Sequence, residues 1–209
     1  MIQIKNAAEL EKMRKACAIS AAALKAGGEA IEPGITTAEI DKIIYDFIVR
    51  HGARPNFLHL YGFPATACIS VNDTVIHGIP SRQQQIRPGD IVSIDTGCKI
   101  DGFNGDNACT YACGKIDLEA QRLLDVTKEG LHRGIEMARG GNRVGDIGHA
   151  VQSYVEENGF SAASSAMVSA KSCMRTLKCR TSATPDAVRG WCPACALLSN
   201  RWFASTSTR

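Results

Sequence analysis

Two aspartates of this sequence have the type and setting that metal chemistry requires. Asp95 ends the apolar run 91–94, and Asp106 follows a glycine-rich turn region. A carboxylate at the buried end of a strand is costly unless it is paired, capped or bound to a cation. A hairpin between them would bring both carboxylates together on neighbouring strands, where hard oxygen ligands suit Mn, Fe, Co or Zn and Asp106 could bridge two ions. The simpler alternative is that both aspartates cap turns.

A histidine upstream of the aspartates is a second candidate. His77 lies in a loop after the apolar run 68–71 and is followed by Gly78 and Pro80. A loop histidine in this setting can reach a cleft and donate a hydrogen bond to a substrate, although a lone exposed histidine is more often inert. His132 and His149 fall in helical patterns and are expected to be surface or packing residues.

The elements that must position these residues begin with two helices. Residues 7–26 show apolar side chains at steps of three and four. Thr36 and Glu39 form a capping-box pattern, and the helix that follows is expected to end at Gly52. The apolar positions of the two helices are Leu10, Met13, Cys17, Ala21 and Leu24 in the first, and Ile40, Ile43, Ile44, Phe47 and Ile48 in the second.

The middle of the sequence changes to strand and turn signals. Residues 65–111 combine short β-rich runs with tight turns at glycines. Helical periodicity returns from Asp117, and Asp146 can cap a further helix through residues 151–155. The aspartates are therefore expected on strands that lie between two pairs of helices.

The sequence repeats itself at an offset of 107 positions without gaps. Three glycines coincide, and the apolar residues between them are similar in size. Periodicity alone could align the apolar residues, but it would not align three glycines, so we predict a duplicated helix-loop-helix unit. The identical pairs are Leu24 and Leu131, Gly27 and Gly134, Glu29 and Glu136, Gly34 and Gly141, Ile40 and Ile147, and Gly52 and Gly159.

Composition and charge divide the chain near Phe160. The 209 residues carry a net charge of +3, but residues 161–209 hold seven basic residues against the single acid Asp186. We therefore expect two differently composed segments, 1–160 and 161–209, the second a basic tail. The charged start of the chain does not resemble a signal peptide, and no apolar run approaches the ~18 residues of a membrane span. These features, with cysteines typical of a reducing compartment, predict a soluble cytoplasmic monomer.

The motifs around the candidate residues resemble those of type I methionine aminopeptidases. The resemblance is carried by Cys68-Ile-Ser-Val-Asn-Asp-Thr-Val-Ile-His77-Gly-Ile-Pro80, by Gly89-Asp-Ile-Val-Ser-Ile-Asp95-Thr-Gly97, and by Gly102-Phe-Asn-Gly-Asp106. It extends from residue 1 to about residue 160. It implies an α+β class, with the duplicated pita-bread fold of the creatinase and aminopeptidase type, its second half truncated here.

The resemblance also implies a site and a reaction. Asp95 would be a terminal ligand and Asp106 the bridging ligand of two divalent metal ions (Co, Mn, Fe or Zn). His77 would bind the substrate and help to stabilise the tetrahedral intermediate, and Leu60, Phe63 and Cys68 would lie near the methionine pocket. A metal-activated hydroxide would attack the peptide bond after an N-terminal methionine. The implied partners are nascent polypeptides near the ribosome, with no membrane and no DNA.

The tail departs from the family. The resemblance places a histidine ligand in a Gly-His-Gly segment, and two glutamate ligands, after residue 160, where this sequence has neither histidine nor glutamate. With two of five ligands present, we expect an inactive chain. The alternative is a non-catalytic half-fold whose basic tail binds RNA or holds zinc, although its cysteine spacing is poor for zinc. The tail cysteines are Cys173, Cys179, Cys192 and Cys195.

A frameshift would explain the tail, and resequencing the gene tests it. Codons for residues 164–170, read one base earlier, permit Phe-Val-Gly-His-Gly-Val-Gly, and residues 192–202 permit a stretch with a family glutamate. We predict that the nucleotide sequence contains these readings. Codons near residues 161–170 that exclude them would show that the hypothesis is wrong.

Overall fold

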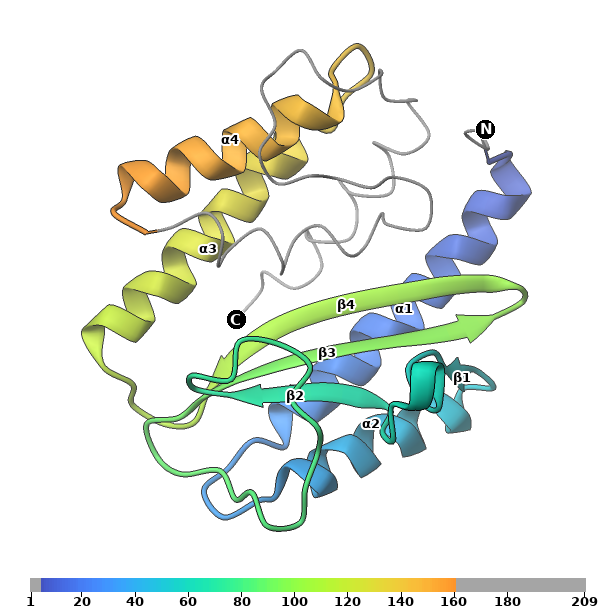
Figure 1. Ribbon diagram of the computed structural model, residues 1–209. Coiled ribbons are helices and arrows are strands. Elements are labelled where there is room, and N and C mark those ends of the chain that lie inside the picture. Colours follow the sequence, from blue (N-terminus) through green and yellow to red (C-terminus); the bar gives the residue numbers. More distant parts are fainter. Residues whose placement is uncertain (1–4, 161–209) are drawn as a thin grey trace. The chain divides into compact units, whose positions relative to one another are not determined.

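The computed structural model describes residues 5–160. Residue contacts divide the chain into two units, Glu11–Ala120 and a second one comprising Met1–Leu10 with Gln121–Arg209. Segment 161–209, which holds the expected frameshift and the cysteines of the alternative zinc site, lies outside the described residues. The described elements are, in order, α1 (Ala7–Glu29), α2 (Thr37–Arg50), β1 (Arg54–Pro55), η1 (Leu60–Gly62), β2 (Ala67–Val71), β3 (Ile91–Ile100), β4 (Phe103–Ala112), α3 (Leu118–Met137) and α4 (Val144–Glu157) (Figure 1).

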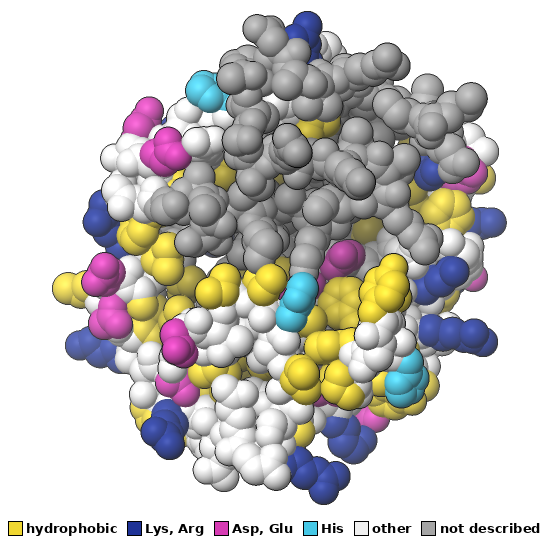
Figure 2. Space-filling model, in the orientation of Figure 1, with side chains coloured by type: hydrophobic (Ala, Val, Ile, Leu, Met, Phe, Trp, Pro, Cys, Tyr) yellow, Lys and Arg dark blue, Asp and Glu magenta, His cyan; other side chains and the backbone are white. Residues whose placement is uncertain are grey.

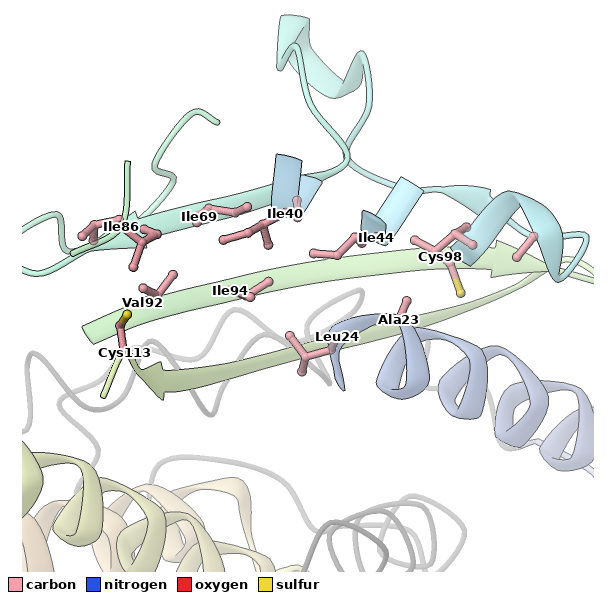
Figure 3. Packing of buried hydrophobic residues seen from close by; sticks show 14 residues of the cluster. Ala23, Leu24, Ile40, Ile44, Ile69, Ile86, Val92, Ile94, Cys98 and Cys113 are labelled. Atoms are coloured by element: carbon pink, nitrogen blue, oxygen red, sulfur yellow. The ribbon is translucent and has the colours of Figure 1, made fainter. Parts of the chain in front are cut away.

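The unit Glu11–Ala120 is built on an antiparallel sheet with β3 at its centre. β3 pairs with β4 along one side and with β1 and β2 along the other. Alternate residues of β3 are buried, among them Val92, Ile94 and Cys98, and they pack with residues of α1 and α2 into one core (Figure 3). One face of the sheet is therefore apolar and covered by helices, as alternation along a strand requires.

A tight hairpin joins β3 to β4. Its two turn residues, Asp101 and Gly102, have φ of 51° and 84°, the left-handed values that a two-residue hairpin turn needs. The hairpin expected between the two aspartates is confirmed. The expectation that Asp95 ends its strand is wrong, because β3 continues to Ile100 and Asp95 lies in its middle.

The second helix forms as its sequence predicts. The amide of Glu39 donates to Thr36 Oγ1 at 3.2 Å, and the amide of Thr36 donates to Glu39 Oε2 at 2.8 Å, which completes the capping box. Ile40, Ile44 and Ile48 are fully buried. Gly52 follows the helix end with φ of 73°.

The first helix packs through a different stripe from the one its apolar spacing suggests. Leu24 is buried as expected, but its buried neighbours are small residues, including Ala16, Ser20 and Ala23. They let the helix backbone approach the sheet closely, since a Cβ on Gly105 would lie 2.3 Å from the carbonyl oxygen of Ala16. Close backbone approach, rather than large apolar side chains, fixes this helix.

The duplicated helix-loop-helix unit is present in the structure. α2 and α4 are both 14 residues long, and their first and last residues are each 107 positions apart. Gly34 and Gly141 have φ of 97° and 99°. A Cβ on Gly27 would lie 2.7 Å from Ile44, and one on Gly134 would lie 2.8 Å from Val151, the equivalent pair. Each helix pair therefore depends on a glycine that admits a side chain of its partner helix.

The paired glycines yield a prediction about stability. Gly27→Ala and Gly134→Ala should each lower the free energy of unfolding by about 1–3 kcal/mol, because the new methyl group overlaps a packed side chain. Gly148→Ala is the control: among the described residues nothing lies within 4 Å of a Cβ there, and a helical alanine should add about 0.5–1 kcal/mol. Urea denaturation measures all three, and similar losses in all three would contradict the packing argument.

Candidate metal-binding face

The two aspartates lie on the same face of the sheet. Asp95 pairs with Ala108, and Asp106 pairs with Gly97, so they occupy diagonal positions of β3 and β4. Diagonal neighbours share a face and are about 7–8 Å apart, within reach of a common group between their side chains. Both carboxylates are half-buried. The sheet thus places them on the face opposite the helices, as the hairpin argument expected.

Polar groups surround the aspartates on this face. Cys68 of β2 pairs directly with Asp95 and is 7% exposed. Two residues from Asp95 along β3, Ser93 pairs with Thr110 of β4, and their hydroxyl groups form a hydrogen bond of 2.8 Å. The face therefore carries carboxylate, hydroxyl and thiol groups, in contrast to the apolar face beneath the helices.

His77 is exposed in a loop that is tied to β2. The amide of Ile69 donates to the carbonyl of Gly78 at 2.9 Å, and the amide of Gly78 donates to Ser70 Oγ at 3.1 Å. A Cβ at position 78 would lie 2.1 Å from the carbonyl oxygen of Ile69, so this approach needs glycine. His77 itself has φ of 56°. The loop thus brings Gly78, the residue after His77, against Ser70, which shares the face of Asp95 by strand alternation.

Leu60 and Phe63 lie in a second loop at this sheet. Leu60 is 47% exposed in η1, and the residues on either side of it, His59 and Tyr61, have φ of 65° and 50°. The loop begins at Asn56, whose amide donates to Gly97 at 2.9 Å and whose side chain donates to Cys98 at 3.2 Å. Gly97 is the strand partner of Asp106, so this loop starts next to the aspartate pair.

Exposed apolar side chains accompany the two loops. They are Leu60 and Tyr61 in one loop and Val75, Ile76 and Ile79 in the other. On the face shown in Figure 2, hydrophobic side chains gather near a histidine and an acidic side chain in the middle of the view. Such a surface is suited to an apolar ligand group held beside polar chemistry.

Asp41 is a residue that the sequence reasoning missed. Its Oδ1 atom accepts hydrogen bonds from the amides of Thr66 and Ala67 at 2.9 and 2.7 Å, where β2 begins. Burial raises the pKa of Asp41, and the two hydrogen bonds oppose that rise. An acid in the first turns of a helix is common, so the sequence carries no signal for this long-range role.

The donor set fits one side of a divalent metal site. Carboxylate oxygens are ligands that these ions prefer, and two are available on one face. The described residues contain no group of three or more His, Cys, Asp or Glu side chains that could hold a metal ion. Asp95 and Asp106 can therefore supply part of a site, and the described range does not complete it.

Comparison with known proteins identifies the family of this sheet and its helices. The model of metallopeptidase family M24 matches residues 11–177. The chain belongs to metallopeptidase family M24. The resemblance to methionine aminopeptidases is confirmed as well: proteins of that name from Clostridium perfringens and Bacillus subtilis are 49% and 43% identical over 161 residues. The matches cover 77% of this chain, which spans only 64% of the length of either relative.

Solved structures confirm the fold. A methionine aminopeptidase from Rickettsia prowazekii matches 77% of this chain and 64% of its own with a TM-score of 0.75 and 37% identity. Prolidase from Pyrococcus furiosus matches 75% of this chain and 44% of its own with a TM-score of 0.64 at 23% identity, a likeness of fold alone. The α+β pita-bread class predicted from the sequence is correct, and the described residues form part of it. No helix among them is long and apolar enough to cross a membrane.

Two thiols of this M24 unit should make its stability depend on pH. Burial raises the pKa of Cys17 to about 11, helped by the charge of Asp106, and burial raises that of Cys98 to about 11, helped by Cys17. The unfolded thiols ionise near pH 9. The folded unit therefore binds more protons between these values, and the free energy of unfolding should fall as pH rises from 9 to 11.

Urea denaturation of Cys17→Ala across this pH range checks the prediction. The free energy of unfolding of the variant should fall less steeply with pH than that of the parent, because one thiol with a raised pKa is gone. Gly148→Ala, which changes no ionisable group, serves as the control and should keep the parent's slope. Equal slopes in the parent and Cys17→Ala would contradict the assignment.

Proposed function

We propose that this chain carries the aspartate-bearing part of a methionine aminopeptidase centre. The observation that supports this proposal most strongly is the diagonal placement of Asp95 and Asp106 on one face of the sheet, in a chain of family M24. The reaction is removal of the N-terminal methionine from nascent polypeptides in the cytoplasm. The similarity to proteins named methionine aminopeptidase supports this substrate.

The residues around the aspartates have complementary roles in the proposed reaction. Asp95 would serve as the terminal ligand and Asp106 as the shared ligand of two divalent metal ions, which would supply water activation and carbonyl polarisation. His77 donates a hydrogen bond to the substrate beside the scissile bond and stabilises the charge that develops there. The side chains that receive the methionyl group are Leu60, Phe63 and Cys68.

The chain is proposed to lack turnover. A five-ligand centre needs a histidine and two glutamates beyond the two aspartates, and residues 161–209 contain neither residue type. Residues 1–160 form the catalytic-domain part and 161–209 the aberrant tail. An incomplete ligand shell holds metal weakly and leaves the reacting groups poorly oriented.

A peptide hydrolysis assay with a metal-binding measurement tests the proposal. With added Mn²⁺ or Co²⁺, the chain should release no methionine from Met-Ala-Ser. It should still bind Mn²⁺ weakly, and Asp95→Asn and Asp106→Asn should each reduce the affinity by at least about tenfold, because each removes a direct ligand. Asp46→Asn on α2 removes the same charge at an exposed ion pair with Lys42 and should change nothing.

The possible results separate the competing functions. Measurable release of methionine would contradict the claim of inactivity and support the aminopeptidase assignment. Mn²⁺ affinity that is insensitive to both aspartate variants would contradict the metal assignment. RNA binding with a steep salt dependence, or tight zinc binding lost with the tail cysteines, would instead favour the non-catalytic alternative.

A further inference from the structure

The loop that carries Leu60 and Phe63 is held at both ends by hydrogen bonds to other parts of the unit. We call residues 57–65 the pocket loop. At its start, Asn56 is bonded to the backbone of β3 at Gly97 and Cys98. At its end, Asp41 of α2 accepts the amides of Thr66 and Ala67 through one oxygen. Both attachment points adjoin the aspartate face, one beside Asp106's strand partner and one beside Cys68.

The attachment at Asp41 is the more demanding of the two. Thr66 and Ala67 are 1% and 0% exposed, so their amides have no water to replace a lost acceptor. The acceptor is the carboxylate of Asp41. Burial raises its pKa, because burial disfavours the charged form. A charged group kept in such a place is costly, and removing it leaves two buried donors without acceptors.

We propose that Asp41 is a positioning residue of the active centre. From α2, it fixes the point where the pocket loop enters β2, so that Cys68 stays opposite Asp95 and the pocket loop stays over the aspartate face. Asp41 acts only through the amides of Thr66 and Ala67 and does not touch substrate. The inference rests on the proposed function for its catalytic meaning, whereas the strand contact itself is in the structure.

The reactivity of Cys68 measures this contact directly. Cys68 is the residue after Ala67, so local opening of the start of β2 exposes its thiol. In the metal-free chain, Asp41→Ala should raise the rate of Cys68 alkylation by iodoacetamide about tenfold or more, relative to Cys113. Cys113 belongs to the core of the same unit and reports global unfolding. Asp41→Asn should restore most of the protection, because its amide oxygen accepts the same two bonds.

A matched control separates positioning from general destabilisation. Thr36→Ala removes the N-cap of the same helix but has no bond to β2. It should lower the melting temperature without changing the rate of Cys68 relative to Cys113. A Cys68 rate that is unchanged in Asp41→Ala, or raised equally in Thr36→Ala, would overturn the proposal.

Mn²⁺ affinity, read from the electron paramagnetic resonance of free Mn²⁺, links the contact to the centre. Asp41→Ala should weaken binding about tenfold, while Asp41→Asn and Thr36→Ala should remain near the parent. If Asp41→Ala raised the alkylation rate of Cys68 but left the Mn²⁺ affinity unchanged, Asp41 would have only a structural role, and the proposed positioning role would be overturned. A parent that binds no Mn²⁺ would count against the proposed function, and the Cys68 rates would still decide whether Asp41 fixes the start of β2.

Discussion

The register of the β3–β4 hairpin is the constraint on which the candidate site depends. Side chains alternate along a strand, so a slip of one residue would move every side chain of β4 to the opposite face. The two-residue turn at Asp101 and Gly102 determines this register and places Asp106 opposite Gly97. With Asp95 on the same face, one backbone feature produces both the apolar core and the paired carboxylates. A loosened turn would disrupt packing and chemistry together.

The helices beneath the sheet hold this register in place through small residues. Ala16 and Ser20 of α1 allow the helix backbone to approach β3 and β4, and Gly105 receives it. The thiol of Cys98 donates to the carbonyl of Ala16 at 3.4 Å, and the hydroxyl of Ser20 donates to that of Thr96 at 3.2 Å. Helix and strand are thus joined by polar contacts within an otherwise apolar layer. Larger side chains at these positions would separate the helix from the strand that carries Asp95.

What the sequence predicts well is local. The capping box at Thr36, the glycine after α2 and the hairpin turn each arise from residues a few positions apart, and all three are present. The buried stripe of α1 and the length of β3 were predicted wrongly, because both depend on tertiary contacts that periodicity does not report. Asp41 was missed for the same reason, since its partners are 25 and 26 positions away. The motif resemblance, rather than spacing, supplied the candidate roles of Asp95, Asp106 and His77.

The duplicated helices show which parts of a repeat physical chemistry preserves. The left-handed glycines before α2 and α4 are kept, and so is the close contact of Gly27 with Ile44 and of its equivalent with Val151, because no other residue type fits there. The cap has diverged: in the second copy Asp146 still accepts the amide of Arg143 at 2.6 Å, but the threonine is gone. The backbone geometry of the two copies is therefore the same at positions where their side chains differ. In the described range, Asp95 and Asp106 lie on β3 and β4, which follow the first copy of the helix pair. The repeated helices therefore support the sheet, and the strands carry the candidate metal ligands.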